Sequence, residues 1–302
     1  LQHHDLASSS VIISGKTMPE PRFVHLRVRS SFSLLEGAIT HAALVDACRQ
    51  ADMPAVGVTD RANLFGVMPF GGAAMGGGIQ PILGSVLPVY IETSTGGSPA
   101  ARRNQRPPSV VVLVKDEIGY GNLLRLMSRA YLGSDPGADL TFAMDDLYAM
   151  NEGLVLLTGG AGGPVARLVL AGEREAASSL LLDMKRAFGD RLYVEIGRHD
   201  ETEELETEKP ILDMAYEHDI PIVATNDVHF IDESMHGAHD ALTCIAESTQ
   251  VIVEDRRHFS LDYRFKSQDE MVELFADLPE AISNTLEIAR RCAFAAPARA
   301  PI

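Results

Sequence analysis

Short apolar runs rich in β-branched residues recur along the chain, and segments with helical periodicity separate them. The runs are residues 23–28, 55–58, 79–90, 110–114, 154–157, 192–196 and 221–225. The helical segments include residues 41–51, 120–132, 173–188 and 203–218. Strands that alternate with helices are typical of parallel β/α units. Seven strands of this kind predict either a β/α barrel or an open doubly wound sheet.

Composition excludes some functions. The 302 residues suit one large domain or two ordinary ones, and the formal net charge is −16. A globally basic DNA clamp is excluded because a phosphate backbone binds a positive surface, although a local basic patch is not. The cysteines Cys48, Cys244 and Cys292 form no CxxC motif, which predicts a reducing, cytoplasmic setting. No apolar run approaches the roughly 18 residues that cross a bilayer, so we expect no membrane partner.

The chain divides into three predicted regions. Residues 1–17 lack the pattern of a signal peptide and are predicted to be a disordered leader or a cloning remnant. Residues 18–262 hold the strands, and residues 93–108 are predicted to form an exposed loop. Residues 263–302 predict two helices, because Ser267 and Glu270 form a capping-box pattern and Pro279 suits a first helical position.

Polar residues follow several of the predicted strands. They are Arg27, Arg29, Glu36, Asp60, Arg61, the TGGAGG turn of residues 158–163, Arg198, His199, Asn226, Asp227 and His229. In a β/α barrel the carboxyl ends of the strands meet at one mouth, where active sites lie. This convergence favours the barrel over the open sheet.

Alternation along the first strand predicts which side chains point inward. His25, Arg27 and Arg29 share one face, and Val24, Leu26 and Val28 share the other. We expect the apolar set to pack on outer helices and the polar set to face the barrel interior, as do Thr225, Asp227 and His229 on the last strand. A buried guanidinium costs several kcal/mol unless it is paired. Glu36, Asp60 and Asp227 are the candidate partners, with Arg27 or Arg29 expected to meet Asp227.

Three interpretations of this polar interior remain open. Asp227, His229, His199, Glu36 and Asp60 could supply metal ligands for a hydrolytic site. Arg27, Arg29 and Arg61 could instead clamp a phosphate. The third interpretation is an internal ion-pair network without a ligand. Three arginines repel a divalent cation, so the charges favour the network or the anion site.

Four further features have a structural and a functional interpretation. The TGGAGG turn could cradle a phosphate but is predicted to be a tight strand-to-helix turn. His236 and His239 have ligand spacing but are predicted to be surface or capping residues. Cys48 lies in an apolar helical segment and is expected to be buried and inert. Residues 200–208 hold six acidic residues and are predicted to be a solvated face.

Seven sequence blocks carry a family resemblance. In order they are PRFVHLRVRSSFSLLEGA, PAVGVTDRANLFGV, IQPILGSVLPVY, GYGNLLRLMSRAY, LYVEIGRH, IVATNDVHF and DLPEAISNTLEIARRC. Together they resemble the N-terminal PHP (polymerase and histidinol phosphatase) domain of bacterial replicative DNA polymerase III alpha subunits, over residues 18–294. The resemblance implies a distorted seven-stranded β/α barrel with a short C-terminal helical extension. That extension, residues 263–302, would lead into a polymerase core outside this chain.

The resemblance also implies the positions of a trinuclear metal site. The HxH element becomes Arg27 and Arg29, the following carboxylate is Glu36, and the TDH element becomes Asp60 and Arg61. The remaining positions, in chain order, are Val86, Gly160, His199, Asp227 and His229. Five ligand positions are therefore lost, three of them to arginine, which has no lone pair to offer a metal.

The implied function is structural, within DNA replication. The domain would support the remainder of the polymerase alpha subunit and dock the proofreading exonuclease subunit, and DNA would be met only through the missing nucleotidyltransferase core. No catalytic residue, metal or other cofactor is expected in the chain. The alternative is a metal-dependent phosphoesterase or 3′-5′ exonuclease that holds Zn, Mn or Mg on Glu36, His199, Asp227 and His229.

Overall fold

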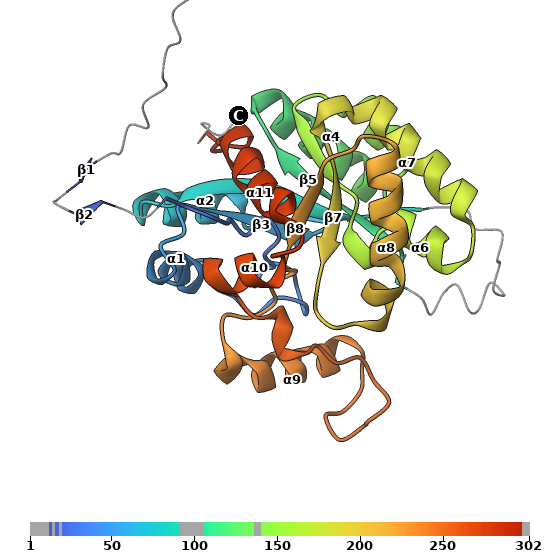
Figure 1. Ribbon diagram of the computed structural model, residues 1–302. Coiled ribbons are helices and arrows are strands. Elements are labelled where there is room, and N and C mark those ends of the chain that lie inside the picture. The colour runs from blue at the N-terminus through green and yellow to red at the C-terminus, as the bar shows by residue number, and fades with distance from the viewer. Residues whose placement is uncertain (1–11, 14–15, 18–19, 91–105, 136–139, 298–302) are drawn as a thin grey trace, which may run out of the picture.

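The computed structural model describes residues 12–13, 16–17, 20–90, 106–135 and 140–297. Within them the main sheet has six strands in the order β3-β4-β5-β6-β7-β8. Their bounds are β3 Ala55–Arg61, β4 Gln80–Pro88, β5 Ser109–Val114, β6 Leu154–Leu157, β7 Leu192–Gly197 and β8 Ile222–Thr225. The sheet curls into a half-barrel, with helices outside it (Figure 1). Six of the seven predicted runs therefore form strands of this mixed α/β fold.

One strand runs against the others. β5 is antiparallel to both β4 and β6, whereas the pairs β3-β4, β6-β7 and β7-β8 are parallel. The expectation of parallel β/α units throughout is therefore wrong at β5. The reversal places the start of β5, at Ser109, beside the carboxyl ends of the other strands.

The first predicted strand is an extended segment, not a member of the regular sheet. Val28 forms isolated parallel bridges with Val58 on one side and Val228 on the other, so residues 23–30 lie between β3 and the chain after β8. The Gly57 N–H donates to the His25 carbonyl at 2.7 Å. A Cβ at Gly57 would lie 2.6 Å from the Leu26 carbonyl oxygen, so glycine is required for this close approach.

Helices cover the convex side of the sheet. In chain order they are α1 His41–Gln50, α2 Val67–Gly76, α4 Glu117–Gly133, α5 Met144–Ala149, α6 Pro164–Leu170, α7 Arg174–Phe188 and α8 Thr202–Glu217. Their apolar faces form one core with the outward side chains of the strands, including Val56, Val112 and Val194. Polar caps set the starts of α1 and α4, where Thr40 and Asp116 accept from backbone N–H groups.

A second, smaller core fills the concave side. Val24 and Leu26 pack there with inward residues of every strand and with Ile288, Ala289 and Cys292. The predicted facing of the first segment is thus wrong for Val24 and Leu26. The prediction that His25 faces the barrel interior with Arg27 and Arg29 is also wrong. Its Nε2 lies 2.8 Å from the Lys266 carbonyl oxygen, and its ring packs between Phe23 and Phe265. The irregular bridging breaks the period of two.

The two helices expected beyond residue 262 are α10 (Gln268–Leu274) and α11 (Pro279–Arg291). The Ser267 capping box and the first-turn position of Pro279 are confirmed. Both helices pack on the barrel, so the structure does not set them apart from it. Asn284 donates to Ile222 O and Gln80 donates to Ala289 O, which ties α11 to the amino ends of β8 and β4.

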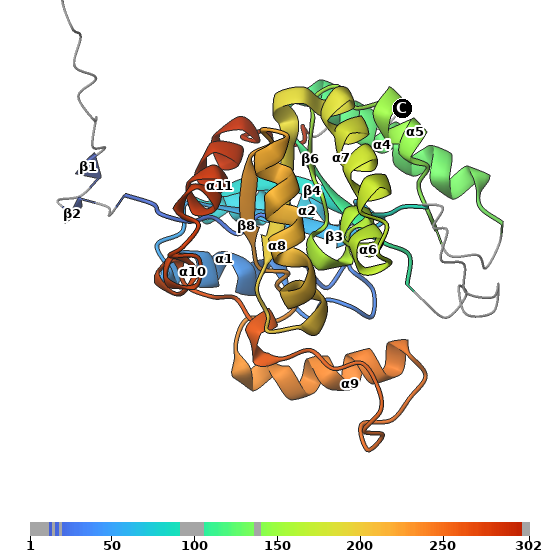
Figure 2. The same cartoon turned by 45° about the vertical axis from the view of Figure 1, so that its right-hand side comes forward.

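The remaining elements lie at the edges. β1 (Ile12–Ile13) and β2 (Lys16–Thr17) pair antiparallel, and the rest of the predicted leader is outside the described residues, as are residues 93–105 of the predicted loop. Short 3-10 turns are η1 Gly160–Gly162, η2 Gly189–Arg191, η3 Glu233–Met235 and η4 Leu261–Tyr263. α9 (His236–Ala246) lies beyond the carboxyl ends of the strands, away from α11 (Figure 2). In the described residues no helix is long and apolar enough to cross a membrane.

Candidate functional site at the barrel mouth

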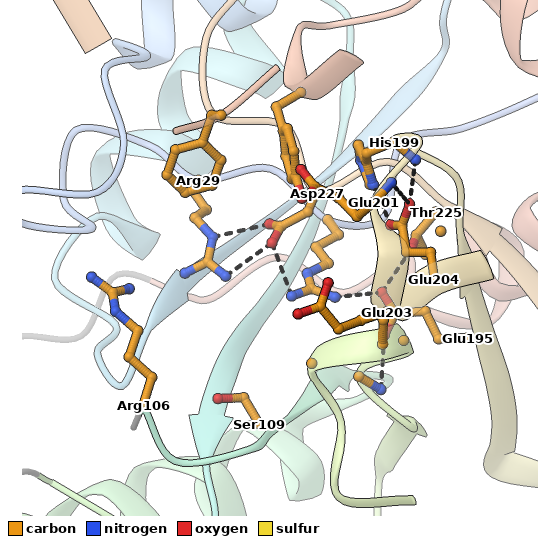
Figure 3. Close-up of a pocket in the computed structure, with 18 of the residues that line it drawn as sticks. Arg29, Arg106, Ser109, Glu195, His199, Glu201, Glu203, Glu204, Thr225 and Asp227 are labelled. Carbon is orange, nitrogen blue, oxygen red and sulfur yellow. Dashed lines mark hydrogen bonds and ion pairs between the residues drawn. The ribbon is translucent and has the colours of Figure 1, made fainter. Parts of the chain in front are cut away.

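A cavity of about 370 Å³ opens at the carboxyl ends of the parallel strands. Its lining is charged, and side chains from distant parts of the chain meet in it (Figure 3). The charged residues that line it are Arg27, Arg29, Arg61, Arg106, Arg167, Glu195, Glu201, Glu203, Glu204, Asp227 and Arg257. The predicted convergence is therefore confirmed for Arg27, Arg29, Arg61, His199 and Asp227, which all line this cavity. It is not met by Arg198, which pairs with Glu208 and Asp277, or by Asn226, which donates to Arg264 O.

Arg27 bridges two carboxylates. Its Nη1 lies 2.8 Å from Glu195 Oε1 and its Nη2 lies 2.9 Å from Asp227 Oδ2. Glu195 also accepts from Thr225 Oγ1 at 2.7 Å and from the Gly159 N–H at 2.9 Å. Glu195 was not among the residues predicted from the sequence. It is the single charged residue in the apolar run of β7, and that interruption is the signal that could have revealed it.

Arg29 is held by two carboxylates. Its Nε and Nη2 meet the two oxygens of Asp227 at 2.9 and 3.1 Å, and its Nη1 lies 2.6 Å from Glu36 Oε2. Burial disfavours the charged form of Asp227, but Arg27 and Arg29 outweigh it and hold the pKa of that carboxyl well below its usual range. The ion-pair network expected between these arginines and Asp227 is present.

The two other candidate carboxylates differ. Glu36 receives Arg106 Nη1 at 2.8 Å and Arg61 Nε at 3.6 Å on one oxygen, besides Arg29 on the other. Asp60 pairs with no arginine within the described residues. It accepts from Ser30 N, Ser30 Oγ and Ser33 Oγ at 2.7–2.8 Å. Asp60 thus orders the turn after the first segment, and its suggested pairing with an arginine is not formed.

His199 is fixed by a carboxylate and an aromatic ring. Its Nδ1 lies 2.6 Å from Glu204 Oε1, and its ring stacks on Tyr263 with centroids 4.0 Å apart. The imidazole is 4% exposed, and its Nε2 has no hydrogen-bond partner in the described residues. Glu204 comes from the acidic segment that was predicted to be a solvated face. That prediction is incomplete, because Glu201, Glu203 and Glu204 line the cavity.

His229 does not line the cavity, and it meets the ion-pair network through Asp227 and the backbone of Glu36. Its Nδ1 meets the Glu36 carbonyl at 3.0 Å, and its Nε2 is 3.6 Å from Asp227 Oδ2. Burial lowers the pKa of His229 to about 4, against the opposing effect of Asp227. His239 is buried beside it and its Nε2 meets the same carbonyl at 2.9 Å, so the surface interpretation is wrong for His239. His236, at the start of α9, meets Phe259 O at 2.8 Å.

The sequence of this chain is similar to a known family of domains. Residues 25–199, more than half of the chain, match the family model described as "PHP domain". The chain belongs to the PHP-domain family. It is 46% identical over 280 residues to the DNA polymerase III subunit alpha of Caulobacter vibrioides (strain NA1000 / CB15N), covering 93% of this chain and 24% of that protein. It is 38% identical over 279 residues to that of Escherichia coli (strain K12), covering 91% and 23%.

This PHP-domain chain therefore spans about a quarter of the length of the curated relatives it matches. Among solved structures, an amidohydrolase from Chromobacterium violaceum aligns over 68% of this chain and 87% of that chain. The identity is 14% and the TM-score is 0.48, which is too distant a likeness to carry an argument.

Two predicted site positions of the PHP domain carry no polar side chain. Val86 on β4 is fully buried in the concave core. Gly160 lies in η1, within the glycine-rich turn. The turn interpretation fits that segment, because Gly159 has φ +92° and a Cβ there would lie 1.8 Å from Ser109 O. Neither position offers a metal ligand.

The mouth also contains residues that the sequence did not single out. Besides Glu195 and Glu204 they include Arg106, Arg257 and Tyr263. These three residues come from the segment before β5 and from the segment after α9, where no strand end predicts a site. Within the described residues, no group of three or more His, Cys, Asp or Glu is placed to hold a metal ion.

Proposed function

We propose that this PHP domain is part of a DNA polymerase III alpha subunit and acts in DNA replication as a structural platform. In this proposal ion pairs occupy the candidate metal positions at the mouth, and the domain performs no hydrolysis. The observation that carries it is the pair of guanidiniums of Arg27 and Arg29 on the carboxylates of Glu195, Asp227 and Glu36.

The residues at the mouth do not fit a metal centre. Arg27 and Arg29 have no lone pair to donate, and they engage the carboxylates that a metal would need. Glu36 is shared by three arginines. His199 and His229 each have a buried Nε2 without a hydrogen-bond partner in the described part of the chain, but of the two only His199 lines the cavity. A catalytic metal needs about three protein ligands.

The platform role rests on similarity and on packing. The relatives are DNA polymerase III alpha subunits, four times as long as this chain. We infer that the remainder of such a subunit is built onto the barrel through residues 263–302, since α10 and α11 are part of its core. Docking of the proofreading exonuclease subunit is a further part of the proposal that comes from the resemblance alone. A cytoplasmic location is another part, and it rests on the cysteine pattern of the sequence.

Metal analysis tests the structural interpretation. The chain would be purified without chelators, and its zinc, manganese and magnesium would be measured by elemental mass spectrometry. We expect far less than one metal per chain and no manganese-stimulated phosphoesterase or exonuclease activity. Stoichiometric metal together with hydrolysis would establish the alternative, a site on Glu36, His199, Asp227 and His229.

A double variant sharpens this test. Arg27→His with Arg29→His restores two lost ligand types, but Arg61, Val86 and Gly160 still leave the metal shell short. We expect no metal-dependent hydrolysis from it, because metal sites need their full ligand set and its supporting contacts. Hydrolysis by the double variant would show that the mouth needs only these two changes to become an enzyme.

A further inference from the structure

The arginines at the mouth outnumber the carboxylates that pair with them. Arg27 and Arg29 pair with Glu195, Asp227 and Glu36. Arg61 and Arg106 then share the remaining oxygen of Glu36, at 3.6 and 2.8 Å. Arg106 gains one more contact, with Glu247 at 3.9 Å. Positive charge is therefore left over on one side of the cavity.

Arg257 adds to this excess. Its guanidinium carbon lies 4.3 Å from the centre of the Phe259 ring, and the described residues give it no carboxylate within 4 Å. Burial lowers the pKa of Arg257 to about 10, and Arg106 and Arg29 act in the same direction. Burial also lowers the pKa of Arg61 to about 10 against the effect of Glu36, with Arg29, Arg106 and Arg257 adding to the fall. Each cation is thus destabilised by burial and by its neighbours, as expected where a negative charge is missing.

The space beside these arginines suits a small anion. Arg61, Arg106 and Arg257 all line the cavity of about 370 Å³. Ser109 stands next to them and accepts from Arg61 Nη1 at 3.2 Å. Figure 3 shows Arg29 and Arg106 on one side of the cavity, and Glu201, Glu203 and Glu204 on the other. The carboxylates would repel an anion, so an anion in this cavity would bind on the side of Arg29 and Arg106.

We propose that Arg61, Arg106 and Arg257 form a binding site for a phosphate group, either as free phosphate or as part of a larger molecule. Guanidinium groups bind phosphate oxygens through paired, charge-assisted hydrogen bonds. The bound group would neutralise the charge that Glu36 leaves over. This site differs from the phosphate clamp considered for Arg27, Arg29 and Arg61, because the structure commits the first two arginines to carboxylates. The proposal does not depend on the platform role.

The test is a titration of the chain in resin-treated, metal-depleted chloride buffer. Inorganic phosphate, pyrophosphate and dAMP are the three probes, followed by isothermal titration calorimetry and by thermal melting. We expect one saturable site and a rise in melting temperature with phosphate concentration. Binding of phosphate alone would identify a free-phosphate site, and binding of dAMP or pyrophosphate alone would identify a site for the phosphate of a larger molecule. No saturable binding of any probe would overturn the proposal.

Three variants locate the site. Arg257→Gln and Arg61→Gln should each weaken binding by about tenfold, the size expected for one charge-assisted contact. Arg264→Gln is the matched control, because Arg264 pairs with Glu270 away from the cavity and should leave affinity unchanged. If either mouth variant fails to fold by circular dichroism, Arg106→Gln replaces it, since Arg106 is 40% exposed. Equal affinity in the wild type and the mouth variants, or an equal loss in the control, would overturn the proposal.

Discussion

The two ends of the barrel are filled by opposite means. At the amino ends of the strands, Ile288 and Ala289 of α11 and Cys292, which follows it, enter an apolar core. Val24, Leu26 and Val223 belong to the same core. At the carboxyl ends, arginines and carboxylates take the corresponding place. Apolar burial stabilises the fold directly, whereas a buried ion pair gains little net free energy. The charged end is therefore stable only as a complete set, whereas the apolar end tolerates graded loss.

Loss of one member of the charged set gives the largest expected effect. Asp227→Asn removes the shared partner of Arg27 and Arg29 while keeping the shape of the side chain. We expect the free energy of unfolding to fall by about 4 kcal/mol, since a buried charge is left without its partner. Urea unfolding measures it. Asp213→Asn, which breaks an exposed pair with Lys209, is the control and should change stability by less than about 1 kcal/mol. A loss no greater than that of the control would contradict the network.

Truncation at the apolar end gives the next largest effect. Ile288 is fully buried on α11, so Ile288→Ala should lower the free energy of unfolding by about 3 kcal/mol through the lost burial and the cavity left behind. Ile252 is 83% exposed, and Ile252→Ala is the control with almost no effect. If Ile288→Ala were neutral, α11 would not close the barrel, and the comparison between its two ends would fail.

Acid is expected to lower the free energy of unfolding by less than either substitution. Burial lowers the pKa of both His25 and His229 to about 4. In the unfolded chain these imidazoles bind protons near pH 6.5, so stability falls as the pH drops from there toward 4. Between pH 7 and 5.5 we expect a loss of about 1 kcal/mol for each histidine. Chemical unfolding at several pH values measures it, with His229→Gln reducing the loss by about half. A stability that stays constant over this range would show that both rings can be charged in the folded protein.

Thiol reactivity is the smallest effect expected. Cys48, Cys244 and Cys292 are buried, and burial raises the pKa of Cys48 and of Cys292 to about 12. Iodoacetamide at pH 8 should therefore label the native chain at these positions only slowly, as mass spectrometry would show. Ile288→Ala should speed labelling at Cys292 more than at Cys48, because it loosens α11. Rapid labelling of Cys292 in the wild type would place that residue outside the core.

Local patterns predicted most of the elements. Apolar runs marked the six strands, and the caps at Ser267 and Pro279 marked α10 and α11. The strand ends also indicated where the mouth lies and that Arg27, Arg29, Asp227 and Glu36 would meet. These predictions succeeded because burial period, capping and the need to pair a buried charge all act on residues near in sequence or at fixed places in a repeat.

Other features depended on contacts between distant segments. The period of two failed at Val24 and Leu26, because isolated bridges to β3 and Val228 set the orientation of that segment. The direction of β5, the partner Arg106 and the contact between Glu204 and His199 carry no local signal. Glu195 interrupts an apolar run, but that interruption does not show that it pairs with Arg27. The sequence alone determined that arginines would stand at the barrel mouth and would need carboxylates. Only the tertiary structure decided which carboxylates they received and which arginines were left with excess charge, because pairing depends on distances that the fold sets.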